Sequence, residues 1–301
     1  MRKGGHTMTS TYEKNLSQMQ QKMLLEQRRI KLRRLGRNRV AVIGTLIVLV
    51  MAVIAIAAPL IATHDPYAFV VADRLMPPSA QHLFGTDSMG QDVFSRVIYG
   101  TRTSMVVGLC VSLSAGFIGT LLGLYASANK VLDHILMRLC DGLKAIPSIL
   151  FAICLMTMLG PDIKNVILSL AITSVPNMAR IARSEALVVR EQTYVEALRS
   201  TGASETRILW LHIAPNIISS IIVQMTFLFA SSIIQEAALS FLGAGLPAGA
   251  PSWGNILSDG KNFIYSAWWL VVFPGIFTIL SVLGFNLFGD GLRDFFNPTK
   301  A

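Results

Sequence analysis

The sequence carries little charge for its length. Only 14% of its 301 residues are Asp, Glu, Lys or Arg, whereas 52% are hydrophobic and the mean hydropathy is +0.55. Soluble globular domains carry about 25% charged residues, and disordered chains combine few hydrophobic residues with high charge. The shortage of charge therefore argues against both an ordinary soluble enzyme and a disordered protein.

Cysteine is also scarce, and common enzyme motifs are missing. The three cysteines are too few for a disulfide scaffold. Gly260-Lys261 has no phosphate loop before it, and no HExxH sequence occurs. The five histidines are scattered along the chain: His6, His64, His82, His134 and His212. We therefore expect no catalytic residue, cofactor or metal site in this chain, and a partly buried structural role for His212.

Long apolar runs are abundant instead. A membrane-spanning helix needs roughly 20 apolar residues, and four uncharged runs have 23 to 28 residues. Two shorter runs contain Pro147 and Pro176, which are expected to kink or break their helices, and are flanked by lysines that can snorkel. The six runs are Val40–Ala62, Thr103–Ser127, Ala145–Gly160, Asn165–Ala179, Ile208–Gln235 and Asn262–Gly289. The sequence therefore predicts an all-α membrane protein with six transmembrane helices.

Basic residues are distributed unevenly between these runs. If the N-terminus is cytoplasmic, 21 of the 26 Lys and Arg residues fall in inner segments and 5 in outer segments. The positive-inside rule then places both termini in the cytoplasm. Eleven of these residues precede Val40, so the basic tail is interpreted as a topology signal at the lipid surface and not as a nucleic-acid site. Within it, Tyr12–Ile30 fits an interfacial helix or, equally, a solvated charged tail.

Two local patterns concern the outer loop and the second span. The segment from Thr63 to Arg102 is rich in proline and glycine, which predicts a turn-rich outer loop. Gly119 and Gly123 form a GxxxG pattern, which favours close packing against another helix.

The longest inner loop, Arg180–Arg207, is expected to form a structured knob. Thr193 and Glu196 have the spacing of a capping box, which predicts a helix from Tyr194 to Thr201. Gly202 then ends this helix in the left-handed conformation. Ser204 is expected to cap a second helix that runs toward the membrane, with Pro215 at the membrane entry.

One charge lies inside an apolar stretch. Glu236 follows Ile217 by 19 residues, which is about 29 Å along a helix and places it near the outer interface. A solvated or loop-bonded carboxylate is favoured there over a substrate-gating one, although Glu236 stays the candidate for an outer gate.

The knob resembles the EAA loop of bacterial ABC importer permeases. Glu196, Ala197, Gly202 and Pro215 keep the spacing of that loop, whereas Leu198, His212 and Ala214 depart from it. The run His82–Ser104 is similar to the signature of the dipeptide, oligopeptide and nickel permeases, with Gln91 in place of the usual arginine, and Pro251–Gly260 resembles their C-type subunit. The signature residues are Gly85, Thr86, Asp87, Gly90, Asp92, Ser95, Arg96 and Arg102.

The resemblance implies a type I ABC importer permease in the bacterial inner membrane. Its expected partners are a homologous second permease, two ATPase subunits that bind ATP and Mg, and an extracytoplasmic binding protein. The ATPase-coupling loop, within residues 180–216, would comprise Tyr194, Glu196, Ala197, Arg199, Gly202, Ala203 and Pro215. Residues 1–39 would form the cytoplasmic tail and residues 40–301 the permease domain. The substrate is expected to be a di- or oligopeptide; a nickel or metal-chelate importer and a stand-alone secondary transporter are the alternatives.

Overall fold

The computed structural model describes residues 39–296, and helices form all of its named elements there. The long helices are α2 (Arg39–Ile61), α3 (Val93–Ala128), α6 (Ile163–Arg190), α9 (Ala214–Phe241) and α11 (Trp269–Phe296). The shorter elements are the 3₁₀ turn η1 (Val71–Asp73), α4 (Lys130–Lys144), α5 (Ser148–Leu159), α7 (Thr193–Ser200), α8 (Glu205–Ile208), the π-helical turn η2 (Leu209–Ile213) and α10 (Trp253–Gly260). The tail and the expected Tyr12–Ile30 helix lie outside the described residues.

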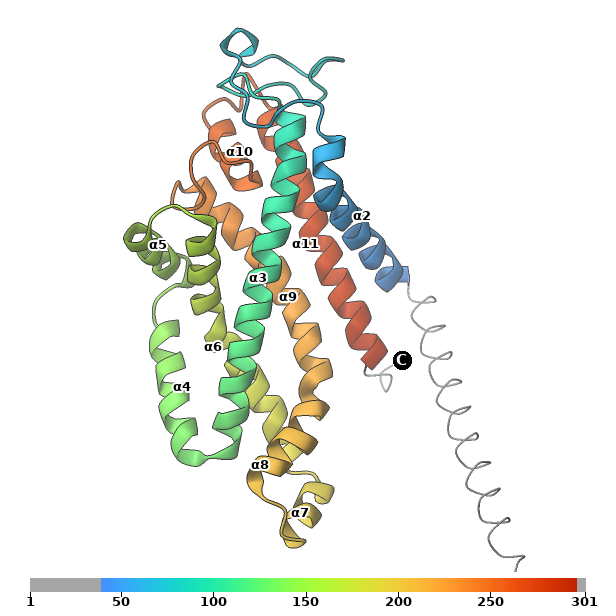
Figure 1. Ribbon diagram of the computed structural model, residues 1–301, viewed down its shortest axis with the longest axis vertical. Helices are drawn as coiled ribbons and strands as arrows, with labels where there is room; N and C mark the ends of the chain where they lie inside the picture. The colour runs from blue at the N-terminus through green and yellow to red at the C-terminus, as the bar shows by residue number, and fades with distance from the viewer. Residues whose placement is uncertain (1–38, 297–301) are drawn as a thin grey trace, which may run out of the picture.

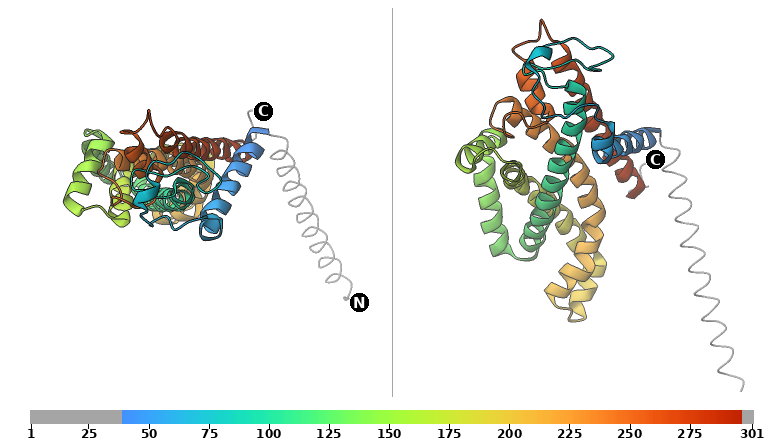
Figure 2. Two further views of the ribbon diagram at one scale, coloured as in Figure 1. Left: turned by 90° about the horizontal axis from the view of Figure 1, so that it is seen from above. Right: turned by 45° about the horizontal axis from the view of Figure 1, so that its top comes forward.

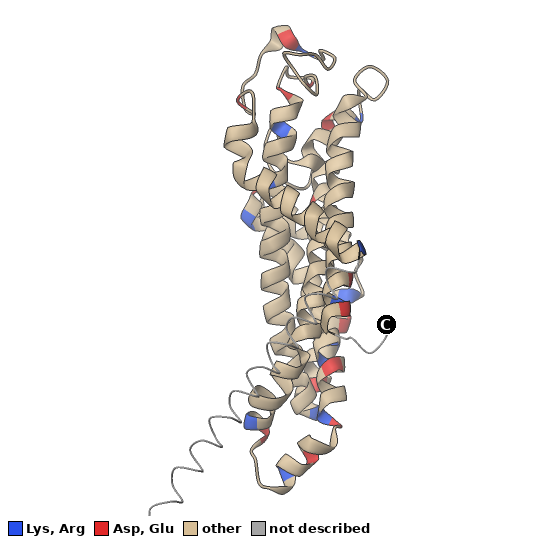
Figure 3. Ribbon diagram, turned by 90° about the vertical axis from the view of Figure 1, so that its right-hand side faces the viewer, with Lys and Arg blue, Asp and Glu red and all other residues tan. Residues whose placement is uncertain are grey.

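Helix α3 forms the axis of the bundle (Figure 1). It packs along α6 and α9, and it also contacts α2. Helix α11 packs between α2 and α9, while α4 and α5 lie on the opposite side of the molecule from α2 (Figure 2). The 62–92 segment and α10 cover the upper end, and α7 with α8 forms the lower tip. The charged residues gather at these ends and in the lower half (Figure 3).

Four helices within residues 39–296 are long and apolar enough to cross a membrane. They are Arg39–Ile61, Val93–Ala128, Glu205–Phe241 and Trp269–Phe296. The second and third long predicted runs lie entirely within these helices. The first run extends one residue beyond its helix, and the fourth begins seven residues before its helix. Helices α4 and α5 are long and apolar enough to cross a membrane only when they are taken together, and the pair is bent by 85°. The fold is therefore an all-helical membrane protein with four or five candidate spans in the described part of the chain.

The third predicted span is interrupted at Pro147, where a break or kink was expected. Instead of one helix over Ala145–Gly160, the structure has α5, whose 12 residues cover only about 18 Å of a hydrocarbon core about 30 Å thick. The sharp bend lies between Lys144 and Ser148, where Pro147 occupies the N-cap of α5. Proline cannot supply the backbone N–H that a continuous helix needs, and it excludes the preceding residue from the helical region. Pro176, in contrast, is buried within α6 and does not end it.

The GxxxG prediction is confirmed by the contact between α3 and α6. A Cβ atom on Gly119 would lie 2.5 Å from Cβ of Met178, and one on Gly123 would lie 2.5 Å from the carbonyl oxygen of Ala179. Real Cβ atoms do not approach other atoms this closely. The missing side chains therefore let the two helix backbones approach each other.

Candidate functional site

The knob at the lower tip, residues 191–216, has the predicted helix–turn–helix form. Helix α7 ends at a left-handed Gly202 with φ +84°. The Gly202 N–H donates to the Arg199 carbonyl at 2.9 Å, and the Ala203 N–H donates to the Leu198 carbonyl at 3.1 Å. These two bonds form a Schellman motif, so the predicted glycine stop is confirmed.

The predicted side-chain caps of the knob are wrong. Thr193 is the first residue of α7, and Gln192 occupies the N-cap position with no side-chain hydrogen bond to the described helix. The capping box fails because the helix begins one residue too early for the Thr193 hydroxyl to face the free N–H groups. Ser204 does occupy the N-cap of α8, but its hydroxyl accepts no capping hydrogen bond within residues 39–296.

Apolar packing anchors the knob to the bundle. Val195 is fully buried on the inner side of α7. It belongs to the same apolar cluster as Ala186 of α6, Ile208 of α8 and Ile213 of η2, and the turn residue Ala203 packs against this cluster. Burying a valine side chain contributes roughly 1.5–3 kcal/mol, so α7 is held by its core contact and not by its ends alone.

Polar contacts close the turn between α7 and α8. Arg199 donates from Nε to Glu205 Oε1 at 2.8 Å, and Arg190 at the end of α6 donates to Glu205 Oε2 at 3.1 Å. Arg190 also donates to the main-chain carbonyl of Ser127 at the end of α3. One glutamate thus links α6, α7 and α8, and a single arginine links this group to α3.

The outer side of α7 remains uncovered. Glu196 and Ala197 are exposed, and within residues 39–296 the Glu196 carboxylate has no hydrogen-bond or ion-pair partner. Tyr194 is 39% exposed, with its hydroxyl accepting a 3.2 Å bond from the Asn216 amide. Helix α7 thus has a buried inner side and an exposed polar outer side, an arrangement suited to binding another protein.

A π-helical turn connects the knob to α9. The Ala214 N–H donates to the Leu209 carbonyl, five residues back, just before Pro215 enters the helix. Pro215 has no N–H to donate, and the neighbouring Asn216 side chain donates to the His212 carbonyl at 2.6 Å. His212 is partly buried, as predicted.

At the upper end, the signature glycines shape the 62–92 segment. Gly85 and Gly90 both have φ +74°. A Cβ atom would lie 2.6 Å from the Met76 carbonyl oxygen at Gly85, and 1.9 Å from the Val70 carbonyl oxygen at Gly90. Both positions therefore require glycine for backbone conformation and for space.

Thr86, Asp87 and Gln91 form hydrogen bonds that hold the 62–92 segment together. Thr86 accepts from the Met76 N–H at 2.8 Å, and the Asp87 carboxylate accepts from the Met89 and Gln91 N–H groups. Gln91, which stands where the family has arginine, donates from its amide to the Pro66 carbonyl at 3.2 Å. The signature thus builds the loop that covers the upper end of the bundle.

Arg96 connects the 62–92 segment to α3 and α10. Its side chain is 1% exposed and pairs with Asp87, which is equally buried. Asp259 of α10 lies 3.5 Å from the same guanidinium. Burial raises the pKa of the Asp259 carboxyl, while Arg96 opposes this rise. Arg102, in contrast, is exposed on α3 and lines an apolar groove with α2, α9 and α11.

Asp92 and Ser95 begin α3. Asp92 Oδ2 accepts from the Ser95 N–H at 2.8 Å as the N-cap residue. The Ser95 hydroxyl accepts from the His64 N–H at 3.0 Å, beyond the end of α2. These two bonds join the start of α3 to the end of α2.

Glu236 is fully buried, so the solvated alternative is wrong, while the loop-bonded alternative is not contradicted. Its carboxylate accepts from the hydroxyls of Ser104 at 2.9 Å and Ser240 at 3.0 Å, which connects α9 to α3. The outer-gate role stays a prediction. It would require movement of α3 relative to α9, because the carboxylate is enclosed by protein.

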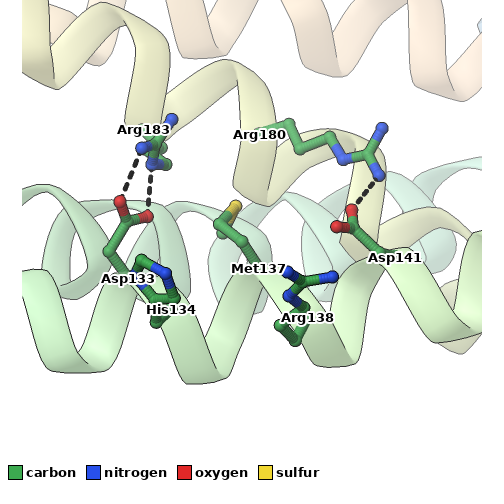
Figure 4. A pocket seen from close by; sticks show the side chains of 7 residues that line it. All are labelled: Asp133, His134, Met137, Arg138, Asp141, Arg180 and Arg183. Carbon is green, nitrogen blue, oxygen red and sulfur yellow. Dashed lines mark hydrogen bonds and ion pairs between the residues drawn. The ribbon is translucent and has the colours of Figure 1, made fainter.

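Ion pairs between α4 and α6 were not predicted. Arg183 binds Asp133 through two nitrogens, one of them at 2.6 Å, and Arg180 pairs with Asp141 (Figure 4). They line a cleft of about 530 Å³ between the two helices. Pairs separated by 39 and 50 residues leave no local pattern in the sequence, so only the folded arrangement reveals them.

Two of the histidines are not scattered. The rings of His64 and His82 are 4.8 Å apart, and His82 Nδ1 lies 2.9 Å from Asp92 Oδ1. The expectation of isolated histidines is therefore wrong for this pair, which the loop fold brings together across 18 residues of sequence.

Comparison with known families identifies the molecule. Residues 115–301 match the family described as the binding-protein-dependent transport system inner membrane component. The chain belongs to this family. Residues 27–78 also match the N-terminal transmembrane domain of oligopeptide transport permease C. It is thus the membrane permease component of an ABC transporter, as the sequence predicted, and the stand-alone secondary transporter is wrong.

Individual relatives cover most of the chain. A putative peptide transport system permease protein of Brucella abortus is 44% identical over 88% of this chain and 90% of its own length. A dipeptide transport system permease protein of Alkalihalophilus pseudofirmus is 42% identical over 88% of both chains. A glutathione transport system permease protein of Escherichia coli is 43% identical, again over 88% of both chains.

The fold is similar to that of a solved transporter. The inward-facing MetNI methionine ABC transporter superposes with a TM-score of 0.57, covering 66% of this chain and 96% of that chain. The sequences are only 17% identical, so this likeness concerns the fold.

Proposed function

We propose that this chain is a permease subunit of an ATP-driven importer of di- and oligopeptides. The observation that carries the substrate class is the 42–44% identity to permeases named for peptides, dipeptides and glutathione. An extracytoplasmic binding protein delivers the peptide, and a homologous second permease completes the pathway. ATP and Mg bind to two partner ATPase subunits, and this chain holds neither.

The knob is the ATPase-coupling loop in this proposal. The support is its construction: Val195 and the Schellman motif hold α7 in place, while Tyr194, Glu196 and Ala197 lie on its outer side. The loop must be held rigidly against the bundle, because a loop that deforms on contact would not transmit ATPase motion to α6 and α9. The backbone path of the loop depends on four further residues: Arg199, Gly202, Ala203 and Pro215.

The permease crosses the membrane six times in this proposal, with both termini in the cytoplasm. Helix α6 supplies one crossing, since its 28 residues reach about 42 Å. The bent α4–α5 pair supplies another; the residues at its break are exposed in this chain, so in this proposal the second permease covers them. The 21 to 5 distribution of basic residues supports the orientation. Residues 1–39 then form a cytoplasmic tail, and residues 40–301 form the permease domain.

The test is uptake by the complete transporter in proteoliposomes, with the binding protein outside and ATP inside. We expect ATP-dependent accumulation of labelled di- or tripeptides, and none when any one of the five components is omitted. Nickel and nickel–histidine chelates are supplied in parallel. Uptake of nickel without peptide uptake would contradict the proposed substrate class, and uptake without ATPase subunits would contradict the importer itself.

A further inference from the structure

A cluster of metal-binding side chains lies at the upper end of the molecule, away from the coupling loop. His64 follows the end of α2, His82 lies in the 62–92 segment, and Asp92 caps the start of α3. One potential ligand atom from each of the three lies within 4.8 Å of the other two. We propose that these three residues form a zinc site that ties the 62–92 segment to α2 and α3.

The distances are close to those of a zinc site. His82 Nδ1 lies 2.9 Å and His64 Nδ1 lies 3.8 Å from Asp92 Oδ1. Tetrahedral zinc with bonds near 2.0–2.1 Å separates its ligand atoms by about 3.3 Å. Relative to Asp92, His82 must move by a few tenths of an ångström and His64 by about half an ångström, and the two imidazoles, whose ligand atoms lie within 4.8 Å of each other, must also approach. His64 Nδ1 must exchange its 3.0 Å contact with the Thr63 hydroxyl for the metal. His64 can move because its side chain is 39% exposed.

The surroundings of Asp92 leave one oxygen for a metal. Oδ2 already accepts the Ser95 N–H, and the Thr63 hydroxyl lies 3.5 Å from it. Oδ1 faces the two imidazoles. This division fixes the carboxylate in the orientation that a ligating aspartate needs.

His82 gives the second indication. Its side chain is only 6% exposed, and within the described structure its Nε2 has no hydrogen-bond partner. Asp73 Oδ2 lies 3.9 Å from this nitrogen. Zinc on Nδ1 would place the ring proton on Nε2, pointing toward Asp73, which is the carboxylate–histidine–metal arrangement of many zinc sites. In the metal-free tautomer that carries its proton on Nδ1, Nε2 would be a buried acceptor without a donor.

The donor set selects the class of metal. Two imidazoles and one carboxylate suit zinc and neighbouring divalent transition metals, whereas calcium and magnesium prefer oxygen ligands alone. Three protein ligands leave a fourth position for water, and the exposed side of His64 gives access to it. The proposal does not depend on the proposed substrate.

Zinc content of the purified complex tests the site directly. The complex is stripped with EDTA, dialysed against micromolar Zn²⁺ and analysed by inductively coupled plasma mass spectrometry. We expect the wild type to hold one more zinc ion per copy of this chain than the His64→Ala complex does. Asp92→Asn keeps an oxygen acceptor for the Ser95 N–H but loses the charged ligand, and titration should show zinc affinity at least about tenfold weaker.

His134→Ala is the matched control, since His134 is an exposed histidine on α4, far from the cluster. It should retain wild-type zinc content. Equal zinc content in the wild type, His64→Ala and Asp92→Asn complexes would overturn the proposal, as would zinc affinity unchanged by both substitutions. Neither measurement uses transport, so this result is separate from the test of the importer function.

Discussion

Arg199 and Glu205 face each other across the Gly202 turn, with Nε and Oε1 2.8 Å apart. Both side chains are partly exposed, at 36% and 52%. Exposed ion pairs of this kind contribute at most about 1 kcal/mol. The shape of the knob must therefore depend mainly on the backbone conformation of Gly202 and on the burial of Val195.

The first prediction concerns this turn. A non-glycine residue in the left-handed conformation costs roughly 1–2 kcal/mol, and a β-branched one is the least tolerated. A Cβ at Gly202 would meet no described atom within 4 Å, so Gly202→Val changes the backbone without a clash. We expect it to reduce ATPase co-purification and peptide uptake strongly, whereas Glu205→Gln leaves both close to wild type.

Gly160→Val is the control for this substitution. Gly160 has φ +87° at the end of α5, again with no described atom within 4 Å of a Cβ position. Its ψ of 162° lies in a region that essentially only glycine adopts, so Gly160→Val strains the backbone at least as much as Gly202→Val does, but far from the knob. Equal loss of ATPase co-purification in the Gly160 and Gly202 variants would show that the effect is general strain and not loss of coupling.

The second prediction concerns Glu196. Because its carboxylate has no partner among residues 39–296, Glu196→Gln should leave the thermal stability of the purified permease unchanged. If an ATPase donor binds this carboxylate, losing the charged hydrogen bond should weaken docking by roughly 1.5–3 kcal/mol, or about ten- to hundredfold. Titration of the ATPase against immobilised permease measures the change. Glu191 is an exposed glutamate at the first position of the knob, outside α7, and Glu191→Gln should bind as the wild type does.

The sequence was informative wherever the signal is local. The Gly202 stop, the GxxxG contact and the four long spans rest on patterns within one helix or one turn, and each is present in the structure. The loop signature was recognisable, but its structural purpose was not. Only the fold shows that Arg96 pairs with Asp87 inside the loop and approaches Asp259 on α10.

The failures have two physical causes. One concerns a position where a single residue decides the geometry: α7 begins at Thr193, and this removes the capping box. The others concern contacts between distant segments, such as His64 with His82 or Arg183 with Asp133. Side chains that meet only after loops and helices have packed leave no periodicity to detect.

The third prediction concerns Glu236. Replacing it with alanine leaves the hydroxyls of Ser104 and Ser240 without their buried acceptor and opens a cavity between α3 and α9. Each unsatisfied buried group costs about 1–3 kcal/mol. Glu236→Ala should therefore lower the melting temperature of the purified permease markedly, and Glu236→Gln should lower it less because an amide oxygen remains as acceptor. Gln235→Ala, next to it, is the control and should melt near the wild type.

The fourth prediction concerns the buried ion pair of the upper loop. Arg96→Leu removes the guanidinium and leaves Asp87 charged and 1% exposed. Losing one partner of a buried pair costs roughly 3–5 kcal/mol. The 62–92 segment should then become sensitive to limited proteolysis and the protein less stable. Arg102→Leu removes an exposed signature arginine from the same helix. If both variants resist protease as the wild type does, Arg96 does not hold the loop.

The last prediction concerns orientation in the membrane. Ser79 is exposed in the 62–92 segment and Ser204 is exposed in the knob, so single cysteines at these positions report the two ends of the bundle. The native thiols are first replaced by serine, above all the exposed Cys154. With the N-terminus in the cytoplasm, a membrane-impermeant maleimide should label Ser79→Cys in intact cells and Ser204→Cys only after the cells are opened. Labelling of Ser204→Cys in intact cells would invert the topology and place the knob beyond the reach of any cytoplasmic ATPase.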